Sequence, residues 1–475
     1  MIAALAVLAA ASGVVAVVPD LGGEPEPAAA TTEAVTPVFS LRRVAPAITR
    51  TIGGQRLGAG IDALLSQPVY GDTRDDTCLV VADPDGRPLY SQGPAKPLIP
   101  ASAMKILTGS VVLSRLGADG KYVTPVRAAA APGPDGVVGD AWLVGSGDPL
   151  LATADYAATA GWMETARPAT SLESLADRIV NAGVRRIGRL LGDESRYDGQ
   201  RYIPTWEPHY ATIPEVGPQS ALTVNGGFAQ WRPRRIAAAS PAPNAANVLA
   251  GLLRARGVTV EATGEGRAPP AASATIAEIE SPPMSEVVGV LLRDSDNLTA
   301  ELLVKELGAR FGGAGTTAAG LGVVRSTASS LGLPTAGLAN ADGSGLDRSD
   351  RLTCDLVQEA LTDARPDGAL ARSLPVAGTS GTLLRRFLGT TAVGRIRAKT
   401  GSLSEVVALA GYATGKDGRD VTFSLVANDL PSDAAGTSLQ NQLANVLAAY
   451  PDAPFPDLLG PEPPRAVTAG ARAAP

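Results

Sequence analysis

The sequence predicts an α/β (α+β) fold in which one domain is interrupted by a large insertion. Residues 39–124 and 277–450 carry clear helical and strand-like patterns, whereas residues 125–276 mix short strand-like runs with clusters of Gly, Pro and Ala. None of the six lysines of the chain lies within residues 125–276. We therefore expect the first and last segments to meet in space as one domain, with residues 125–276 inserted between them.

The first segment predicts a helix, a pair of strands and a second helix. Residues 54–67 have helical periodicity, and residues 77–92 predict two strands joined by a Pro-Asp-Gly turn. Apolar residues at helical spacing then run from Ser102 to a glycine stop at Gly117. A helix that begins near Ser102 places Lys105 one turn later on the same face.

The last segment predicts two helices, a sheet and a closing helix. Residues 285–312 form two amphipathic patterns that break at Asp-Ser-Asp-Asn, and the glycine-rich residues 311–320 favour a loop between helices over a nucleotide-binding loop. Strand-like runs and a final helical pattern follow at residues 394–401, 404–414, 420–429 and 437–450. Both ends of the chain thus supply helices and strands for one shared layered core.

The two termini lack the pattern of a folded core. Residues 1–18 carry no charge and predict a signal peptide or an N-terminal membrane anchor, and residues 19–38, rich in Pro, Ala, Thr and Glu, predict a tether. Residues 451–475 predict a disordered tail. We therefore expect an exported protein, either secreted or held at the outer face of the cytoplasmic membrane, with membrane contact only through its first residues.

Composition argues against several classes of function. The formal net charge of −6 disfavours nucleic acid as a partner. The single histidine, His209, leaves no histidine pair for zinc, and we expect it to be a surface or packing residue rather than a catalytic base. Cys78 and Cys354 lack histidine partners for a zinc site, and whether they form a disulfide stays open. We expect neither a metal nor a cofactor.

Ser102 and Lys105 form the one SxxK motif of the chain. A serine nucleophile without a histidine needs another base, and a lysine can serve when burial or a neighbouring cation lowers its pKa. Arginine cannot serve, because it keeps its proton in proteins. Taken alone, however, the motif could equally be a helix N-terminus followed by a surface lysine.

Two further motifs carry residue types that such a site needs. Ser-Asp-Asn at 295–297 lies at the break between two predicted helices, and Lys-Thr-Gly-Ser at 399–402 ends a predicted strand. Alone, the first could be a helix N-cap and the second a turn between strands. In the order SxxK, SxN and KTG, however, the three motifs together favour an acylating site.

The three motifs resemble those of the serine penicillin-recognising enzymes. The surrounding residues are similar to the D-alanyl-D-alanine carboxypeptidase/endopeptidase family, the low-molecular-mass class C penicillin-binding proteins. Similar segments are "VGSGDPLL" at 144–151, "GPQSALTVNGG" at 217–227, "DGSGLDRSDRLT" at 342–353 and "LPVAGTSGTLLRRF" at 374–387. The resemblance covers residues 50–450 and implies a β-lactamase/transpeptidase-like domain whose antiparallel sheet is flanked by helices.

The resemblance also implies a role for each motif residue. The implied catalytic residues are Ser102 (nucleophile), Lys105 (general base), Ser295 (proton relay), Asn297 and Lys399, and the implied substrate-binding residues are Thr400, Gly401 and Ser402. Backbone N–H groups of Ser102 and Ser402 would form the oxyanion hole. Lys399 would both lower the pKa of Lys105 and bind the terminal carboxylate of the substrate.

The expected function is that of a serine-type D-Ala-D-Ala carboxypeptidase. Its expected substrates are peptidoglycan stem peptides, and β-lactam antibiotics are expected to acylate it as inhibitors. The motifs serve DD-endopeptidase action on cross-links equally well. A β-lactamase, which shares the three motifs, and a non-catalytic wall-binding scaffold remain as alternatives.

Overall fold

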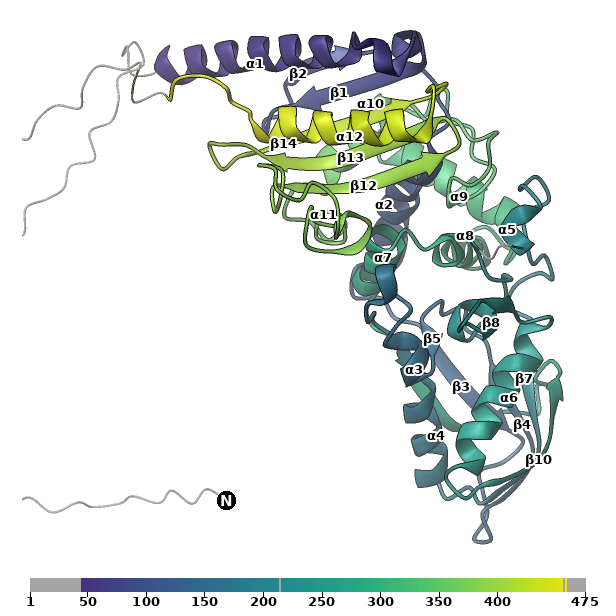
Figure 1. Ribbon diagram of the computed structural model, residues 1–475. Coiled ribbons are helices and arrows are strands. Elements are labelled where there is room, and N and C mark those ends of the chain that lie inside the picture. Colours follow the sequence, from purple (N-terminus) through teal and green to yellow (C-terminus); the bar gives the residue numbers. More distant parts are fainter. Residues whose placement is uncertain (1–43, 213–214, 456–457, 459–475) are drawn as a thin grey trace, which may run out of the picture.

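The computed structural model describes residues 44–212, 215–455 and 458 (Figure 1). The predicted signal or anchor (1–18), the predicted tether (19–38) and most of the predicted tail therefore lie outside the described residues. Within them, no helix combines the length and the apolar character that crossing a bilayer requires.

An antiparallel five-stranded sheet combines strands from both ends of the chain. Its order is β12-β13-β14-β1-β2, and each neighbouring pair is antiparallel. The strands are β1 (Thr77–Ala82), β2 (Pro88–Gln92), β12 (Ile396–Leu403), β13 (Val406–Thr414) and β14 (Asp420–Ala427). The meeting of the first and last segments in one sheet, with helices on both faces, confirms the predicted α/β (α+β) class.

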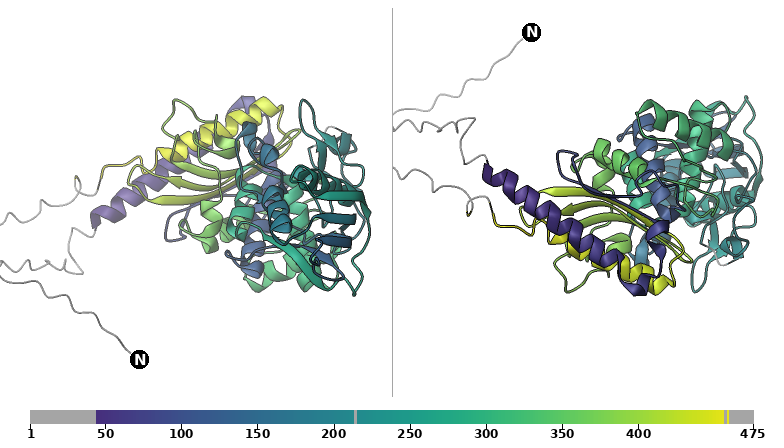
Figure 2. Two further views of the ribbon diagram at one scale, coloured as in Figure 1. Left: turned by 90° about the horizontal axis from the view of Figure 1, so that it is seen from below. Right: turned by 90° about the horizontal axis from the view of Figure 1, so that it is seen from above.

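Helices from opposite ends of the chain cover one face of this sheet. α1 (Val44–Leu65) and α12 (Asp433–Ala448) lie side by side across the strands, as Figures 1 and 2 show. Their apolar residues share one buried core with that face of the sheet. Burial of the apolar surface of α1 and α12 against the sheet is the main stabilising contribution of the two helices.

The other face of the sheet carries a second group of helices, of which α2 (Met104–Leu116) and α8 (Asn297–Phe311) contain motif residues. The group also contains α7 (Met284–Arg293), α9 (Thr317–Ser330), α10 (Cys354–Ala364) and the short α11 (Ala369–Arg372). These helices form a second buried core, which reaches the sheet at Ala410 and Tyr412 of β13. The predicted break between α7 and α8 and the predicted loop before α9 are both confirmed.

A second five-stranded sheet, of order β10-β7-β4-β3-β11, lies within the middle of the chain. Its strands are β3 (Val123–Ala128), β4 (Val137–Val144), β7 (Arg186–Asp193), β10 (Thr259–Glu265) and β11 (Ala274–Glu280). β4, β7 and β10 are parallel, and α4 (Leu172–Asn181) and α6 (Pro241–Arg254) provide the crossovers that parallel neighbours require. The division into domains at residues 125 and 276 stays a prediction.

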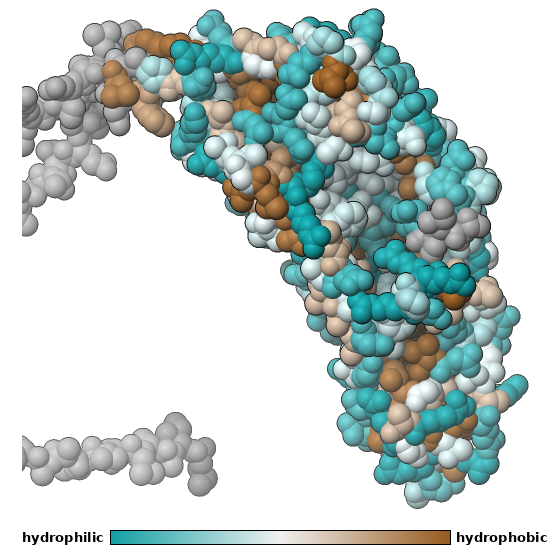
Figure 3. All heavy atoms as spheres, in the orientation of Figure 1, coloured by the Kyte–Doolittle hydropathy of each residue, from teal (hydrophilic) through white to brown (hydrophobic). Residues whose placement is uncertain are grey.

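Short elements complete the middle of the chain. They are α3 (Ala154–Ala157), α5 (His209–Thr212), the strand pair β5 (Leu151–Ala152) and β6 (Thr170–Ser171), and the strand pair β8 (Phe228–Gln230) and β9 (Ile236–Ala237). On the face drawn in Figure 3, hydrophilic residues dominate and apolar residues are scattered in small groups. Such a mixture is typical of a surface in contact with water.

Two sequence predictions need correction at their boundaries. Ser102 lies in a single 3-10 turn, η4 (Ala101–Ala103), and the α-helix begins two residues later at Met104. Ala101 has a φ of 45°, outside the range of a right-handed helix, so the regular helix cannot start before it. The start of the predicted tail is also ordered, because the carbonyl oxygens of Asp452 and Pro454 accept hydrogen bonds from α1.

Cys78 of β1 and Cys354 of α10 form a disulfide, which answers the question that the sequence left open. Both residues are fully buried. The bond ties the first segment of the chain to the last, next to the SxxK helix.

Loss of this disulfide should destabilise the protein. We expect the double variant Cys78→Ala/Cys354→Ala to have a free energy of unfolding lower by about 2–5 kcal/mol, because the cross-link restricts the unfolded chain over a separation of 276 residues. Urea unfolding without reductant measures the change. Reductant should destabilise the wild type and leave the double variant unaffected, and equal midpoints for the two proteins without reductant would contradict the expectation.

Candidate active site

The three motifs, although separated by hundreds of residues, line one cavity of about 710 Å³. Its lining includes Ser102 from η4, Ser295 and Asn297 from the turn between α7 and α8, and Thr400 and Ser402 from β12. Lys105 and Lys399 lie behind this lining and are fully buried. The structure therefore brings together all three motifs that the sequence singled out.

Lys105 has three hydrogen-bond acceptors at its amine. Its Nζ lies 2.9 Å from Oγ of Ser102, 2.7 Å from Oδ1 of Asn297 and 2.6 Å from the carbonyl oxygen of Ser344. A neutral amine keeps two N–H donors and one lone pair. With Asn297 and the Ser344 carbonyl as fixed acceptors, the lone pair of a neutral Lys105 faces the hydroxyl of Ser102.

Burial lowers the pKa of Lys105 to about 8, although nearby carboxylates oppose the shift. The strongest opposing charges are those of Asp342 and Glu301. Glu301 is itself fully buried, and burial together with the charge of Asp342 raises its pKa to about 8. Lys105 is thus tuned to exchange its proton close to neutral pH, as a general base requires.

The sequence reasoning gave no role to the loop that presents the Ser344 carbonyl. The carboxylate of Asp342 accepts hydrogen bonds of 2.6 to 3.1 Å from the backbone N–H groups of residues 344–347. Gly345 takes a φ of 79°, and a Cβ at this position would lie 1.8 Å from the carbonyl oxygen of Ala101. The segment "DGSG" therefore fixes an acceptor for Lys105 and supports the turn that carries Ser102.

Lys399 is bonded to the second motif rather than to the first. Its Nζ donates to Oγ of Ser295 (2.8 Å) and to the carbonyl oxygen of Thr400 (2.6 Å). Burial, followed by the positive charge of Lys105, holds the pKa of Lys399 well below its ordinary value. Among the described residues, no carboxylate forms an ion pair with Lys399, so no counter-charge offsets the cost of charging its buried amine.

The Ser-Asp-Asn turn is held by an arginine from the middle of the chain. Ser295 has a φ of 59°, and the next residue, Asp296, caps α8 by accepting a 2.7 Å hydrogen bond from the N–H of Thr299. The guanidinium of Arg167 lies 3.1 Å from the Asp296 carboxylate, and its side chain is only 3% exposed. Burial by itself would raise the pKa of Asp296. The charge of Arg167 and the hydrogen bonds from Thr299 outweigh this effect of burial, so the pKa of Asp296 lies below its ordinary value. No sequence motif pointed to Arg167.

Gly401 allows β12 to approach Ser102 closely. A Cβ at Gly401 would lie 3.0 Å from Cβ of Ala408 and 3.1 Å from the backbone nitrogen of Ser102. On either side of it, the Thr400 hydroxyl donates to Oγ1 of Thr382 (2.9 Å) and the Ser402 hydroxyl to the carbonyl oxygen of Gly401 (2.8 Å). The edge of β12 thus lies directly beside the turn that carries Ser102.

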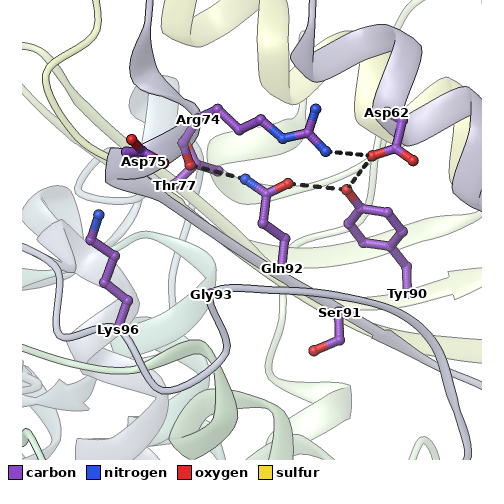
Figure 4. Close-up of a pocket in the computed structure, with 9 residues that line it drawn as sticks. All are labelled: Asp62, Arg74, Asp75, Thr77, Tyr90, Ser91, Gln92, Gly93 and Lys96. Carbon is purple, nitrogen blue, oxygen red and sulfur yellow. Dashed lines mark hydrogen bonds and ion pairs between the residues drawn. The ribbon is translucent and has the colours of Figure 1, made fainter.

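Two other features lie apart from this cavity. His209 is exposed and lies against the ring of Tyr210, with 4.2 Å between ring centroids. A separate depression of about 520 Å³ lies at the edge strand β2 (Figure 4). Arg74 and Tyr90 both bond there to Asp62, so these polar groups already satisfy one another. Neither feature contains a motif residue.

Comparisons with known proteins agree on one family. A model described as the D-Ala-D-Ala carboxypeptidase 3 (S13) family matches residues 57–235 and 212–450. A D-alanyl-D-alanine carboxypeptidase of Actinomadura is 31% identical, and the match covers 90% of this chain and 91% of that protein. Carboxypeptidase DacB of Mycolicibacterium smegmatis is 33% identical over 383 residues, which cover 77% of this chain and 79% of that protein.

Solved structures show the same fold. Penicillin binding protein 4 from Haemophilus influenzae superposes with a TM-score of 0.68 at 18% identity, over 82% of this chain and 99% of that one. A second structure of that protein, in complex with a β-lactam, gives a TM-score of 0.59 at 18% identity over the same shares of the two chains. The predicted transpeptidase-like architecture is therefore confirmed at the level of the fold.

Proposed function

The chain belongs to the D-Ala-D-Ala carboxypeptidase 3 (S13) family, and we propose that it hydrolyses the terminal D-Ala-D-Ala bond of peptidoglycan stem peptides through an acyl-enzyme on Ser102. The observation that carries the proposal is the buried amine of Lys105, 2.9 Å from the hydroxyl oxygen of Ser102. Its pKa of about 8 suits a group that takes and returns a proton near neutral pH.

Acylation begins when Lys105 accepts the hydroxyl proton of Ser102. Oγ of Ser102 then bonds to the carbonyl carbon between the two D-alanines, and the backbone N–H groups of Ser102 and Ser402 bind the developing oxyanion. The closeness of Gly401 to the backbone nitrogen of Ser102 supports this pairing of donors. The negative charge on the carbonyl oxygen therefore develops where two backbone N–H groups, one from η4 and one from β12, can donate to it.

Collapse of the intermediate breaks the C–N bond and releases the terminal D-alanine. Its amine must gain a proton, which Lys105 took from Ser102. Ser295 relays this proton, a role supported by its bond to Lys399 and its place on the cavity lining. Asn297 orients Lys105 by accepting a 2.7 Å hydrogen bond from it. Water then hydrolyses the ester, with Lys105 again as the base.

Lys399, with the hydroxyls of Thr400 and Ser402, binds the free carboxylate of the substrate. In the empty site, burial and the charge of Lys105 hold the pKa of Lys399 low. An incoming carboxylate supplies the counter-charge that Lys399 lacks, so it favours a protonated Lys399. A protonated Lys399 in turn disfavours the charge on Lys105. Lys399 thereby offsets the negative charge of the bound carboxylate, which alone would favour a protonated Lys105.

Peptide hydrolysis and drug binding test this function together. The purified chain should release D-alanine from a peptide that ends in Lys-D-Ala-D-Ala and should form a stable adduct with labelled penicillin, and Ser102→Ala should abolish both. A Haemophilus relative of the same fold has been solved with a bound β-lactam, which supports the choice of probe. Rapid turnover of the drug would instead indicate a β-lactamase, no adduct would indicate a scaffold, and an adduct that survives Ser102→Ala would refute the assigned nucleophile.

The proposed place of action is outside the cytoplasm. Carboxypeptidase relatives and a disulfide, which persists in oxidising compartments, both support it. Residues 1–18 would direct export, as a signal peptide or as an anchor. We further propose that residues 39–124 and 277–450 form the catalytic domain and residues 125–276 an inserted domain, a division supported by their membership of two separate sheets.

A further inference from the structure

The backbone N–H of Ser402, one of the two proposed oxyanion donors, shares a peptide group with the carbonyl of Gly401. This peptide bond is trans and planar, so the carbonyl and the N–H point in opposite directions. Whatever holds the Gly401 carbonyl therefore sets the direction of the Ser402 N–H. β12 is an edge strand of the sheet, and backbone pairing with β13 holds it from one side.

Gln440 of α12 bridges two backbone carbonyls at this point of the sheet. Its Nε2 donates to the carbonyl oxygens of Ala408 (2.8 Å) and Gly401 (3.3 Å). Gly401 and Ala408 are partners in the register of β12 and β13. One amide nitrogen therefore ties the two strands together at the peptide group that carries the proposed donor.

The Ser402 hydroxyl also donates to the Gly401 carbonyl, but it lies at the cavity. Its Oγ is 2.8 Å from the carbonyl oxygen, and Ser402 lines the active-site cavity. A hydroxyl has one proton to donate, and in the proposed reaction this proton goes to the carboxylate of the substrate. Once substrate is bound, Gln440 is the side-chain donor that remains on the Gly401 carbonyl among the described residues.

The neighbours of Gln440 permit one orientation of its amide. Gln440 is 1% exposed, and a buried amide without hydrogen bonds would cost free energy. Its Oε1 accepts a 3.0 Å hydrogen bond from the guanidinium of Arg386, which can only donate. The two carbonyls on the other side can only accept. An exchange of the amide oxygen and nitrogen would therefore set donor against donor and acceptor against acceptor.

Arg386 is itself held by α12. Its guanidinium also donates to Oδ1 of Asn441, the neighbour of Gln440, at 2.7 Å and 3.2 Å. Arg386 lines the active-site cavity. A chain of hydrogen bonds thus runs from the cavity wall through Arg386 and Gln440 to the Gly401 carbonyl.

We infer that Gln440, oriented by Arg386, is a positioning residue for the oxyanion hole. It holds the peptide group between Gly401 and Ser402 so that the Ser402 N–H meets the negative charge that develops on the substrate. The inference rests on the proposed function and adds to it a residue outside the three motifs. Because the oxyanion forms in the transition state, loss of this hold should slow the reaction and leave binding of the intact substrate unchanged.

Two substitutions of Gln440 test the inference. Gln440→Met removes the donor with little change in side-chain volume. We expect its kcat/KM for release of D-alanine from a peptide that ends in Lys-D-Ala-D-Ala to fall about 10-fold. This loss is smaller than the about 100- to 1,000-fold cost of deleting an oxyanion donor, because the N–H is misaligned rather than absent. Gln440→Glu keeps an acceptor for Arg386 but sets an oxygen against the two carbonyls, so it should lose at least as much.

A peptide boronic acid gives a readout that a purely structural role would not move. Its boron accepts a lone pair from Oγ of Ser102 while Lys105 takes the hydroxyl proton and no group leaves, so an oxygen on the tetrahedral boron occupies the oxyanion hole. Affinity for this probe should fall about 10-fold in Gln440→Met. Affinity of the Lys-D-Ala-D-Ala peptide for Ser102→Ala, which binds without reacting, should change less than about 2-fold when Gln440→Met is added.

Gln442→Met is the matched control. Gln442 lies on the same helix, and its amide donates to the hydroxyl oxygen of Tyr70 (2.6 Å) rather than to the sheet. The control removes the same chemical group, so its kcat/KM and its affinity for the boronic acid should stay within about 2-fold of the wild type. Urea unfolding compares the stability of all the variants.

The outcomes separate the inference from the function on which it rests. Wild-type affinity for the boronic acid in Gln440→Met would overturn the inference, and if that variant does not fold, wild-type affinity in Gln440→Glu would overturn it. An equal loss of affinity for the boronic acid and for the intact peptide would also overturn it, because the whole site would then have lost its shape. A wild-type protein that neither releases D-alanine nor binds the boronic acid would overturn the proposed function, and the inference with it.

Discussion

Replacement of Lys105 by arginine should lower the rate of acylation of Ser102 by about three orders of magnitude. The guanidinium keeps its proton at every accessible pH, so the variant retains a positive charge but loses the general base. In the proposed mechanism, Lys105 acts as a base only when it is neutral. For a peptide without a free carboxylate, the rate should therefore rise with pH through the Lys105 pKa of about 8. Rates of acylation measured between pH 5 and 10 test both statements.

Two further variants keep this expectation open to refutation. Lys105→Met removes the base with little change in side-chain volume. We expect this variant to acylate as slowly as Lys105→Arg and to unfold at a similar urea concentration to Lys105→Arg. Lys96→Arg changes a side chain that is 37% exposed and paired with Asp76, so it should acylate at the wild-type rate. Acylation of the Lys105→Arg variant within 10-fold of the wild type would mean that another group is the base.

Replacement of Lys399 by methionine should remove the preference of the enzyme for substrates with a free terminal carboxylate. A hydrogen bond between charged groups contributes about 1.5–3 kcal/mol, so kcat/KM for a carboxylate-ended peptide should fall about 10- to 100-fold. The corresponding terminal amide offers no charge for Lys399 to bind, so its kcat/KM should fall far less. The burial of Lys399 and its lack of a carboxylate partner among the described residues motivate this expectation.

The pH dependence of the same variant tests the coupling of the two lysines. In the wild type, the acylation rate should rise at a lower pH for the carboxylate-ended peptide (its acid limb) than for the amide. The reason is that the bound carboxylate keeps Lys399 charged, and a charged Lys399 lowers the pKa of Lys105. In Lys399→Met the limb for the carboxylate-ended peptide should no longer lie at lower pH than the limb for the amide, because the carboxylate alone favours a protonated Lys105. Lys416→Met, an exposed lysine in the turn between β13 and β14, should keep the separation. Limbs that coincide in the wild type would refute the coupling.

Much of the site could be read from the sequence because its chemistry resides in short contiguous motifs. SxxK spans one helical turn, so local geometry alone puts Ser102 and Lys105 on one face. The residue types in the other two motifs are those that an acyl-transfer site needs. The order of the motifs indicates the serine penicillin-recognising enzymes, and the segments around them indicate the carboxypeptidase family that the comparisons confirm.

Several functional contacts had no local signal. Arg167 and Asp296 are 129 positions apart, and nothing in the spacing of either residue predicts that they pair. The carbonyl of Ser344 is a backbone group, which residue identity cannot reveal, and it meets Lys105 across 239 positions. The positive φ of Ala101, which begins the turn that carries Ser102, and the close approach of the loop at Gly345 to the Ala101 carbonyl oxygen also have no local signal.

Three short motifs in a fixed order identify the groups that could react, namely the hydroxyls of Ser102 and Ser295, the amines of Lys105 and Lys399, and the amide of Asn297. Hydrophobic periodicity, which is also a local property of the chain, predicts the fold class. The reactivity of those groups, in contrast, arises only in the folded protein. The pKa of Lys105 depends on its complete burial and on the charges of Asp342 and Glu301, which the chain brings to it from more than 190 positions away. Desolvation and Coulomb interactions depend on distance in space, and that distance exists only in the folded protein.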